Sequence, residues 1–419
     1  MSFASAYIEK RALFPQLIDE APDQNTRIIV IVPSYAETQI TRLFNSLQAA
    51  HKPECIVEVH VIVNAPENAA EENILQNSKT LTEIESWKSE NRSCWFRLFS
   101  CYVQPGAVPG WGVGLARKTG MDEAARRFNS IEQSEGLIVN LDADCTVREN
   151  YFTSLYKEFY RDNRKMACSI YFEHEVAGRE YDKRVYRNIA LYELHLRYLL
   201  QAQKYAGFPW AFHTVGSSMA VRASEYVAAG GMNRKQAGED FYFIQKLVDS
   251  GNYFSLNSTA VYPSPRTSFR VPFGTGAAMG KMQEDSDTEY FTYNILAFDD
   301  LRILFSGLDK IFNSHTGAGE FYNSLPESIR TFVSESEWLD KLTEIQQNTS
   351  GLFSFRKRFF VWFNMFRIVR YLNSVHPGQY PKIPVNKAAA SLLKRLGMDA
   401  DSDSASDLLE IYRALERKS

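Results

Sequence analysis

The feature that most constrains the fold is a continuous apolar run near the N-terminus, in which Ile28–Val32 are followed by Pro33. A strand with one solvated face would alternate apolar and polar residues, so this run predicts a central strand buried on both faces. The residues that follow alternate further apolar strands with amphipathic helices: strands are expected at Val57–Val63, Trp95–Val103 and Gly136–Leu141, and helices at 39–50, 69–91 and 113–128. This alternation predicts an α/β fold with a mainly parallel sheet.

Several polar residues come directly after these predicted strands. Tyr35 and Glu37 follow the first strand, Asn64 follows the second, and Asp142 and Asp144 follow the fourth. Ligands of open α/β sheets bind beyond the carboxyl ends of the strands, so these residues are expected to line one site. Two carboxylates at positions i and i+2 can converge on Mg²⁺ or Mn²⁺, which prefer oxygen ligands and share them with substrate phosphates. A solvated acidic turn is the alternative interpretation.

A second acidic pair, Glu239-Asp240, opens a helix that is predicted over Phe241–Val248 and stopped by Gly251. Carboxylates at a helix N-terminus are stabilised by the backbone dipole, so simple capping is one interpretation. The functional interpretation is a general base that takes a proton from an acceptor hydroxyl.

Basic residues at two further places in the chain are candidates for contacts with phosphate. Gly112-Val113-Gly114 precedes Arg117 at a helix start, with a spacing that matches neither a dinucleotide fingerprint nor a P-loop. Backbone N–H groups there, together with Arg117, can face a pyrophosphate, although a flexible connector is equally compatible. Arg266 and Arg270 follow a strand predicted at Ser258–Tyr262. Their planar guanidinium groups suit phosphate, and solvated loop arginines are the alternative.

Taken together, the segments between Ile28 and Gly251 resemble the family-2 glycosyltransferases of the GT-A fold. Six segments match in the family's order: Pro33-Ser34-Tyr35-Ala36-Glu37, Gly112-Val113-Gly114-Leu115-Ala116-Arg117, Leu141-Asp142-Ala143-Asp144, Val215–Arg222, Gly230-Gly231-Met232 and Glu239-Asp240. Each segment alone is a weak signal, whereas the ordered set is specific. The resemblance implies the GT-A sheet, mixed and mainly parallel and flanked by helices, with a helical C-terminal region beyond the matched segments.

The resemblance also assigns roles to individual residues. It implies that a sugar is moved from a UDP- or GDP-sugar to an acceptor hydroxyl, with Mn²⁺ or Mg²⁺ held by Asp142 and Asp144. Asp240, with Glu239 beside it, would be the general base of an inverting displacement. The remaining residues divide between the two substrates: Pro33, Tyr35, Glu37, Asn64, Arg117, Asp142, Arg266 and Arg270 on the donor side, and Gly216 and Ser217 on the acceptor side.

The sequence departs from the family pattern at three places. Ala36 occupies the position where the family usually has asparagine. Asn64 replaces the aspartate expected near the base and ribose, which leaves the donor base open. The stretch YPSPRTSF lacks the histidine that often serves as a further metal ligand, and neither His213 nor His315 is assigned to that role.

Three regions are expected along the chain: an N-terminal extension at 1–26, the catalytic domain at 27–275, and a helical region at 276–419. Within the last region, helices are predicted at 289–305, 326–347, 352–372, 386–396 and 405–417. The helix at 352–372 interleaves basic and aromatic residues. It is expected either to pack inside the protein, with arginine stems covering the apolar stripe, or to make peripheral contact with an anionic membrane surface.

The overall composition restricts the cellular role of the protein. A net charge of -3 argues against a general nucleic-acid binder. The N-terminus carries charges before any apolar core, which is atypical of a secretory signal. Five cysteines without a CxxC pair fit reduced thiols. We therefore expect a cytoplasmic protein, with association at the inner face of the membrane as the alternative.

Other functions are compatible with parts of this pattern. A retaining transferase of the same fold, similar to mannosylglycerate synthase, would use the same donor site. A sugar-phosphate nucleotidyltransferase would need a Gly-rich basic signature after the first strand, which PSYAETQITRL lacks. A catalytically inactive binding scaffold is disfavoured by the presence of both acidic motifs.

Overall fold

The computed structural model describes residues 2–108, 111–234, 238–267, 275–284, 289–312, 317–398, 402 and 404–418. Two compact units are formed. The first comprises Met1–Tyr186, Thr214–Glu284 and Arg417–Ser419, and the second comprises Arg187–His213 and Asp285–Glu416. The long helix α6 (Lys183–Ala206) begins in the first unit and continues in the second.

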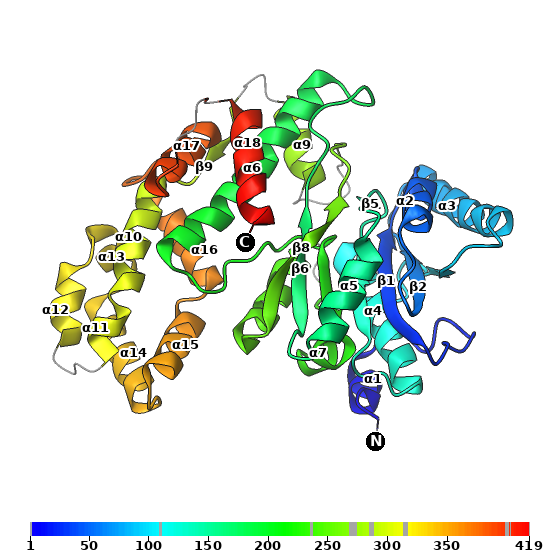
Figure 1. Cartoon of the computed structure of the whole chain (residues 1–419), viewed down its shortest axis with the longest axis horizontal. Helices are drawn as coiled ribbons and strands as arrows, with labels where there is room; N and C mark the ends of the chain where they lie inside the picture. Colours follow the sequence, from blue (N-terminus) through cyan, green and yellow to red (C-terminus); the bar gives the residue numbers. More distant parts are fainter. Residues whose placement is uncertain are drawn as a thin grey trace. The chain divides into compact units, whose positions relative to one another are not determined.

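The first unit is built on an eight-stranded sheet in the order β3-β2-β1-β4-β7-β6-β8-β5. Strands β1, β2, β5, β6 and β8 of this sheet are labelled in Figure 1. Its strands are β1 (Thr26–Ser34), β2 (Ile56–Val63), β3 (Arg97–Tyr102), β4 (Leu137–Asn140), β5 (Thr146–Val147), β6 (Ala167–Phe172), β7 (Met219–Arg222) and β8 (Tyr253–Tyr262). Strands β3, β2, β1 and β4 run parallel to one another, β7 is antiparallel to β4 and β6, β6 and β8 are parallel, and β5 is antiparallel to β8. The predicted fold class, a mixed, mainly parallel sheet with flanking helices and a helical C-terminal region, is confirmed.

Strand β1 occupies the central position that its apolar run predicts. All of Ile28–Val32 are inaccessible to solvent, and the strand lies between β2 and β4. Helix α4 (Val113–Ser130) packs on β1 and β2. A side chain at Gly120 would bring a Cβ within 2.5 Å of Ile31 Cγ2, so the glycine permits this close approach. Because α4 follows β3, its first turn lies at the carboxyl edge of the parallel strands.

Three of the other helices of this unit agree with the sequence predictions to within a few residues: α2 (Ile40–Ala49), α3 (Glu71–Glu90) and α8 (Glu239–Leu247), which ends in the 3₁₀ turn Val248–Ser250. No bounds are predicted from the sequence for the remaining helices, α1 (Ser5–Arg11), α5 (Tyr151–Arg161), α7 (Ala223–Ala228) and α9 (Thr275–Glu284). Gly251 follows α8 with a φ of 83°, the left-handed conformation that stops a helix.

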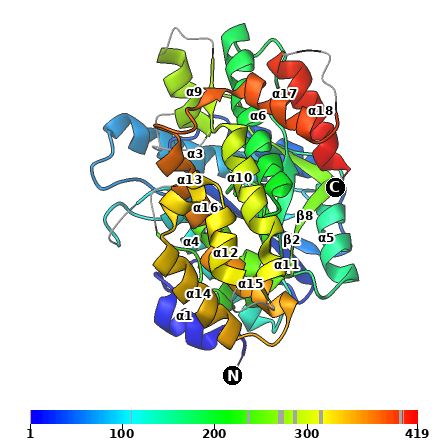
Figure 2. The same ribbon diagram turned by 90° about the vertical axis from the view of Figure 1, so that its left-hand side faces the viewer.

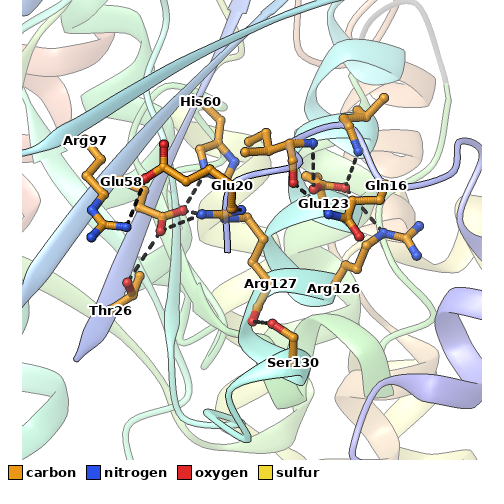
Figure 3. Close-up of polar contacts among 12 residues, drawn as sticks. Gln16, Glu20, Thr26, Glu58, His60, Arg97, Glu123, Arg126, Arg127 and Ser130 are labelled. Atoms are coloured by element: carbon orange, nitrogen blue, oxygen red, sulfur yellow. Dashed lines mark hydrogen bonds and ion pairs between the residues drawn. The ribbon is translucent and has the colours of Figure 1, made fainter. Parts of the chain in front are cut away.

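A buried polar cluster ties the N-terminal extension to α4 (Figure 3). The Arg127 guanidinium donates to both oxygens of Glu58 at 2.6 and 2.8 Å, and to the Glu20 carbonyl at 2.6 Å. The Glu123 carboxylate accepts backbone N–H groups of Leu17 and Ile18 at 3.2 and 3.3 Å. Burial alone would raise the pKa of Glu58, but hydrogen bonds from His60 and Arg127 lower it to about 2. These contacts hold the C-terminal half of α4, whose N-terminal half carries Arg117.

The second unit is helical, and its members can be followed in Figure 2. After α6 come α10 (Ile295–Ser306), α11 (Leu308–Phe312), α12 (Gly317–Ser324), α13 (Glu327–Phe332), α14 (Glu335–Gln347), α15 (Leu352–Trp362), α16 (Met365–Val375), α17 (Val385–Arg395) and α18 (Ala405–Arg417), with the short antiparallel pair β9 (Phe291–Thr292) and β10 (Ile383–Pro384).

Three helix predictions in this region were wrong in their bounds. The helix expected at 289–305 begins only at Ile295, after β9. The helix expected at 326–347 is broken before α14, where Ser334 accepts the Glu337 N–H at 3.3 Å. The helix expected at 352–372 is broken before α16, where Asn364 accepts the Arg367 N–H at 3.2 Å. In both broken helices a side-chain oxygen caps the start of the second helix. The spacing of apolar residues alone does not reveal such a cap.

The basic aromatic segment packs within its own unit. Phe355, Phe359, Phe360, Phe363 and Tyr371 are buried, and Phe359 meets Trp338 of α14 edge to face at 6.2 Å between ring centroids. The guanidinium of Arg367 lies 4.5 Å from the Trp362 ring centroid. Of the two arrangements expected for the segment at 352–372, packing of its aromatic stripe inside the protein is the one that the structure shows. Within the described residues, no helix combines the length and apolar character needed to cross a membrane.

Candidate functional site

The candidate site lies at the carboxyl ends of β1, β2 and β4. These strands are parallel neighbours, so the residues that follow them emerge at one edge of the sheet. The Asn64 N–H donates to the Ser34 carbonyl at 3.1 Å, and the Asn64 side-chain amide donates to the Gly112 carbonyl at 3.0 Å. Asn64 thereby joins the end of β2 to the start of α4. Pro33 is buried within the last residues of β1 itself.

The turn after β1 holds its carboxylate rigidly. Ala36 has a φ of 48°, a left-handed conformation that a residue with a Cβ rarely adopts, and its N–H donates to Asn77 at 2.8 Å. The Glu37 side chain is only 2% exposed, and its Oε1 accepts the N–H groups of Thr38 and Gln39 at 2.9 and 3.0 Å. Two backbone donors therefore fix the position of this carboxylate.

Arg266 joins the turn after β1 to the acidic motif after β4. Its Nη1 donates to Glu37 Oε1 at 2.9 Å, its Nη2 contacts Glu37 Oε2, and its Nε donates to Asp144 Oδ2 at 3.1 Å. Burial by itself lowers the pKa of Arg266, but the Glu37 and Asp144 carboxylates outweigh it and raise that pKa above its usual value. The guanidinium is a permanent cation between two carboxylates.

Arg117 joins the same motif to the second acidic pair. From the first turns of α4 it donates to Asp142 Oδ1 at 2.5 Å and forms an ion pair with Glu239. The side chain is 5% exposed, and a Cβ at Gly216 would lie 2.3 Å from Arg117 Nη1. Only a glycine at position 216 leaves room for the guanidinium. Burial by itself lowers the pKa of Arg117, but the carboxylates of Asp142, Glu239 and Asp240 outweigh this effect and raise the pKa above its usual value.

The second acidic pair opens α8, beside Gly216. Asp240 Oδ1 accepts the Phe241 N–H at 2.7 Å, and the Gly216 N–H donates to the same carboxylate. Burial raises the pKa of Glu239 to about 7 in spite of the adjacent Arg117. Burial also raises the pKa of Asp240. Both carboxyl groups are thus held nearer to neutrality than an exposed acid, which suits groups that exchange protons near pH 7.

The acceptor-side residues predicted before β7 lie between the two acidic motifs. The hydroxyl of Ser217 is hydrogen-bonded to Cys145, which directly follows Asp144. Ser217 is buried, so it presents little surface to a ligand in this state. Arg270 and His315 lie outside the described residues. His213 belongs to the second unit, where its Nε2 lies 3.0 Å from Glu416 Oε2.

The donor set at the acidic motif fits a hard divalent cation that is shared with a substrate. The side chains of Asp142 and Asp144 are 39% and 24% exposed, and each reaches the sheet edge with carboxylate oxygens. Within the described residues no group of three or more His, Cys, Asp or Glu side chains is placed to hold a metal ion. Mg²⁺ is commonly bound by one or two protein carboxylates, with waters and substrate phosphates as its other ligands. Two aspartates are therefore enough protein ligands for such an ion.

The site contains two further residues that the sequence analysis did not single out, Trp111 and Asn77. Trp111 meets Tyr35 edge to face at 5.4 Å between ring centroids. Asn77 donates to the Asn64 carbonyl at 3.2 Å in addition to its bond with Ala36. The signal for Asn77 was present: it shares the buried stripe of α3 with Thr80, Ile84 and Trp87 at helical spacing. A polar residue in a buried stripe usually has a specific partner.

Comparisons with known proteins give only distant structural likenesses. No family model matches the chain, and no curated protein matches it by sequence. One similar solved structure is TarS 1-349 of S. aureus in complex with UDP-GlcNAc, with 15% identity, 85% of this chain and 93% of that chain covered, and a TM-score of 0.42. Another is the mannosyltransferase PcManGT of Pyrobaculum calidifontis in complex with GDP-Man and Mn²⁺, with 14% identity, 99% and 92% covered, and a TM-score of 0.35. Because these TM-scores lie below 0.5, function is inferred below from the residues of the site.

Proposed function

We propose that the protein is a metal-dependent glycosyltransferase of the family-2, GT-A type, which moves a sugar from a nucleotide-diphosphate donor to an acceptor hydroxyl. The observation that carries the proposal is the position of Arg117, which contacts Asp142 on one side and Glu239 on the other. One buried guanidinium therefore joins a metal-type acidic motif to a base-type acidic pair. A transferase needs these two functions beside each other, because the leaving group and the attacking hydroxyl meet at one carbon.

On the donor side, Asp142 and Asp144 would hold Mn²⁺ or Mg²⁺. The bound ion would neutralise charge on the departing nucleotide diphosphate as a Lewis acid. Arg266, and by resemblance Arg270, would contact the phosphates, since the planar guanidinium fork matches phosphate oxygens. The turn at Tyr35, with Asn64 behind it, would contact the nucleoside of a UDP- or GDP-sugar.

On the acceptor side, Asp240 would act as the general base of an inverting displacement. Its carboxylate accepts backbone N–H groups from Phe241 and Gly216, which aim it from the start of α8. The raised pKa of Asp240 makes it a stronger base than an exposed aspartate. Glu239 is engaged with Arg117, so a supporting role in orienting the pair fits it better than proton transfer.

The remaining proposals concern organisation and location. We assign catalysis to residues 27–275 and place the protein in the cytoplasm. A peripheral contact with an anionic membrane is favoured by one observation on α15: Phe353 is 84% exposed beside the exposed basic residues Lys357 and Arg358. Apolar side chains flanked by lysine and arginine suit the interface of an anionic bilayer.

The decisive experiment measures nucleotide binding by titration calorimetry, with UDP and GDP, in the presence and absence of Mn²⁺. Wild type should bind one of the two in a Mn²⁺-dependent manner, and Asp144→Ala should abolish that binding while the chain stays folded. Asp162→Ala is a matched control, because Asp162 has a similarly part-exposed side chain, 33%, but pairs with Arg164 away from the site. Equal binding by wild type and Asp144→Ala, with or without Mn²⁺, would refute the proposed metal site.

A further inference from the structure

We propose that Arg266 neutralises Asp144 in the free protein, as the divalent cation would in the donor complex. In this proposal its guanidinium occupies the space between Glu37 and Asp144 until metal and nucleotide arrive together, and then exchanges these carboxylates for the donor's diphosphate. The proposal rests on the proposed function and extends it, since it states how the site is occupied before the donor binds and why its two ligands bind jointly.

The contacts of Arg266 show a cation that spans two acidic segments. One edge of the guanidinium faces Glu37, and the Nε lies 3.1 Å from Asp144 Oδ2. Glu37 and Asp144 lie 229 and 122 residues away from Arg266 in the sequence. Glu37 is fixed by two backbone N–H groups, so this carboxylate cannot follow an arginine that moves. Any rearrangement must therefore occur on the Arg266 side.

A metal ion and Arg266 compete for the same carboxylate. A divalent cation held by Asp144 would lie within a few ångströms of the guanidinium that already shares this group. Two positive groups at such a distance repel strongly in a partly buried site, where the effective dielectric constant is well below that of water. Metal binding to Asp144 therefore favours release of Arg266, and Arg266 opposes metal binding when no phosphate is present.

The two arginines of the site differ in how firmly they are held. Arg117 is 5% exposed and is enclosed by Asp142, Glu239 and the bare Cα of Gly216. Arg266 is 19% exposed and lies in the irregular segment that follows β8. Arg117 is thus a fixed part of the site, whereas the Arg266 side chain can turn toward solvent, where a diphosphate would lie.

The exchange couples the two ligands. A nucleotide diphosphate supplies oxygens that suit the planar fork of the released arginine, so it lowers the free energy of the metal-bound state. By linkage, the metal must then raise nucleotide affinity by the same factor by which the nucleotide raises metal affinity. Loss of Arg266 should reduce this factor and should also change the affinity for metal alone.

The test is titration calorimetry with MnCl₂ alone, then with UDP and GDP at fixed Mn²⁺. Arg266→Gln should bind Mn²⁺ alone about tenfold or more tightly than wild type, because Glu37 and Asp144 lose their competing cation. The same variant should bind the Mn²⁺–nucleotide pair more weakly. Arg148→Gln is the matched control. Arg148 stands four residues after Asp144, its Nε donates to the Tyr262 hydroxyl at 3.2 Å, and it forms no ion pair with any residue that the structure describes. The substitution therefore removes a nearby charge and leaves Glu37 and Asp144 paired with Arg266.

Arg266→Lys provides a second variant in case the glutamine variant fails to fold. A single ammonium group cannot bridge both carboxylates as the guanidinium does, so Mn²⁺ affinity should lie between those of wild type and Arg266→Gln. No gain in Mn²⁺ affinity in either variant would overturn the exchange, and if wild type still binds nucleotide with Mn²⁺ the proposed function stands. If wild type binds neither UDP nor GDP at any Mn²⁺ concentration, the proposed function itself fails.

Discussion

Gly216→Ala is expected to displace the guanidinium that joins the two acidic motifs, although it adds only a methyl group. Gly216 precedes β7, and its Cα lies against the side chain of Arg117. The substitution removes no charge and no hydrogen-bonding group. Any loss of binding or activity must therefore come from the position of Arg117 or of the Gly216 backbone that donates to Asp240.

The size of the effect follows from the distances. An added Cβ would lie 2.3 Å from Arg117 Nη1, 2.5 Å from Cζ and 2.7 Å from Nη2. Ordinary van der Waals contact begins at 3.4 Å, so the guanidinium has to retreat by 3.4 minus 2.3, or about 1.1 Å. Overpacking of this kind costs about 1–3 kcal/mol. A misplacement of about 1 Å in a reacting site can lower the rate about 10²-fold.

The assay combines thermal unfolding of the full chain with nucleotide binding and sugar transfer. The melting temperature of Gly216→Ala should fall by several degrees, because 1 kcal/mol lowers it by roughly 2–4 °C in a unit of the size of the first one. Gly319→Ala in α12 is the control, because an added Cβ there meets nothing within 4 Å. That substitution at a half-buried helical position should be neutral or slightly stabilising, since alanine favours the helix over glycine.

Two results would refute this account of Arg117. The first is a melting temperature and a nucleotide affinity for Gly216→Ala that equal those of wild type. The second comes from a double-mutant cycle with Arg117→Lys. Because lysine lacks the fork that meets the methyl group, the methyl should destabilise the Arg117→Lys background less than wild type. Equal destabilisation in both backgrounds would assign the effect to the backbone instead.

The remaining predictions concern catalysis and membrane contact. Asp240→Asn should lower kcat about 10²–10⁴-fold with little change in nucleotide binding, and normal turnover by this variant would exclude Asp240 as the base. In wild type, kcat/KM should rise with pH as Asp240 and the adjacent Glu239, whose pKa is about 7, lose their protons. The full chain should sediment with anionic liposomes at low salt and be released at high salt. The triple variant Phe353→Ser, Lys357→Glu and Arg358→Glu should not sediment. Absence of sedimentation by wild type would exclude the membrane contact.

Much of the first unit could be predicted from local patterns. The runs at Ile28–Val32 and Gly136–Leu141 have no polar alternation, and both became buried inner strands. Such runs are informative because only burial on both faces tolerates them. The same reasoning places Asp142 and Asp144 at the carboxyl edge of the sheet, because they come directly after a buried strand.

The pairing of the site residues could not be predicted in this way. Arg266 meets Glu37 across 229 residues and Arg117 meets Glu239 across 122, and no local spacing records these contacts. The need for glycine at position 216 is likewise invisible in the sequence, because the atoms that exclude a Cβ belong to α4. Local patterns indicate which residues can reach an edge of the sheet, whereas tertiary packing decides which charges neutralise each other there.

The charge of the assembled site gives a reason for the proposed joint binding of metal and nucleotide. Seven ionisable side chains form its centre: Glu37, Asp142, Asp144, Glu239 and Asp240, with Arg117 and Arg266. With all five carboxylates ionised, the two guanidinium groups leave a charge of 2 minus 5, or -3; when Glu239, whose pKa is about 7, is protonated, the charge is 2 minus 4, or -2. A diphosphate would be repelled by this centre, and a divalent cation alone would have to displace Arg266 from Asp144. Bound together, the cation would neutralise the aspartates while the phosphates would accept hydrogen bonds from the displaced guanidinium, so each ligand would remove the obstacle to binding of the other.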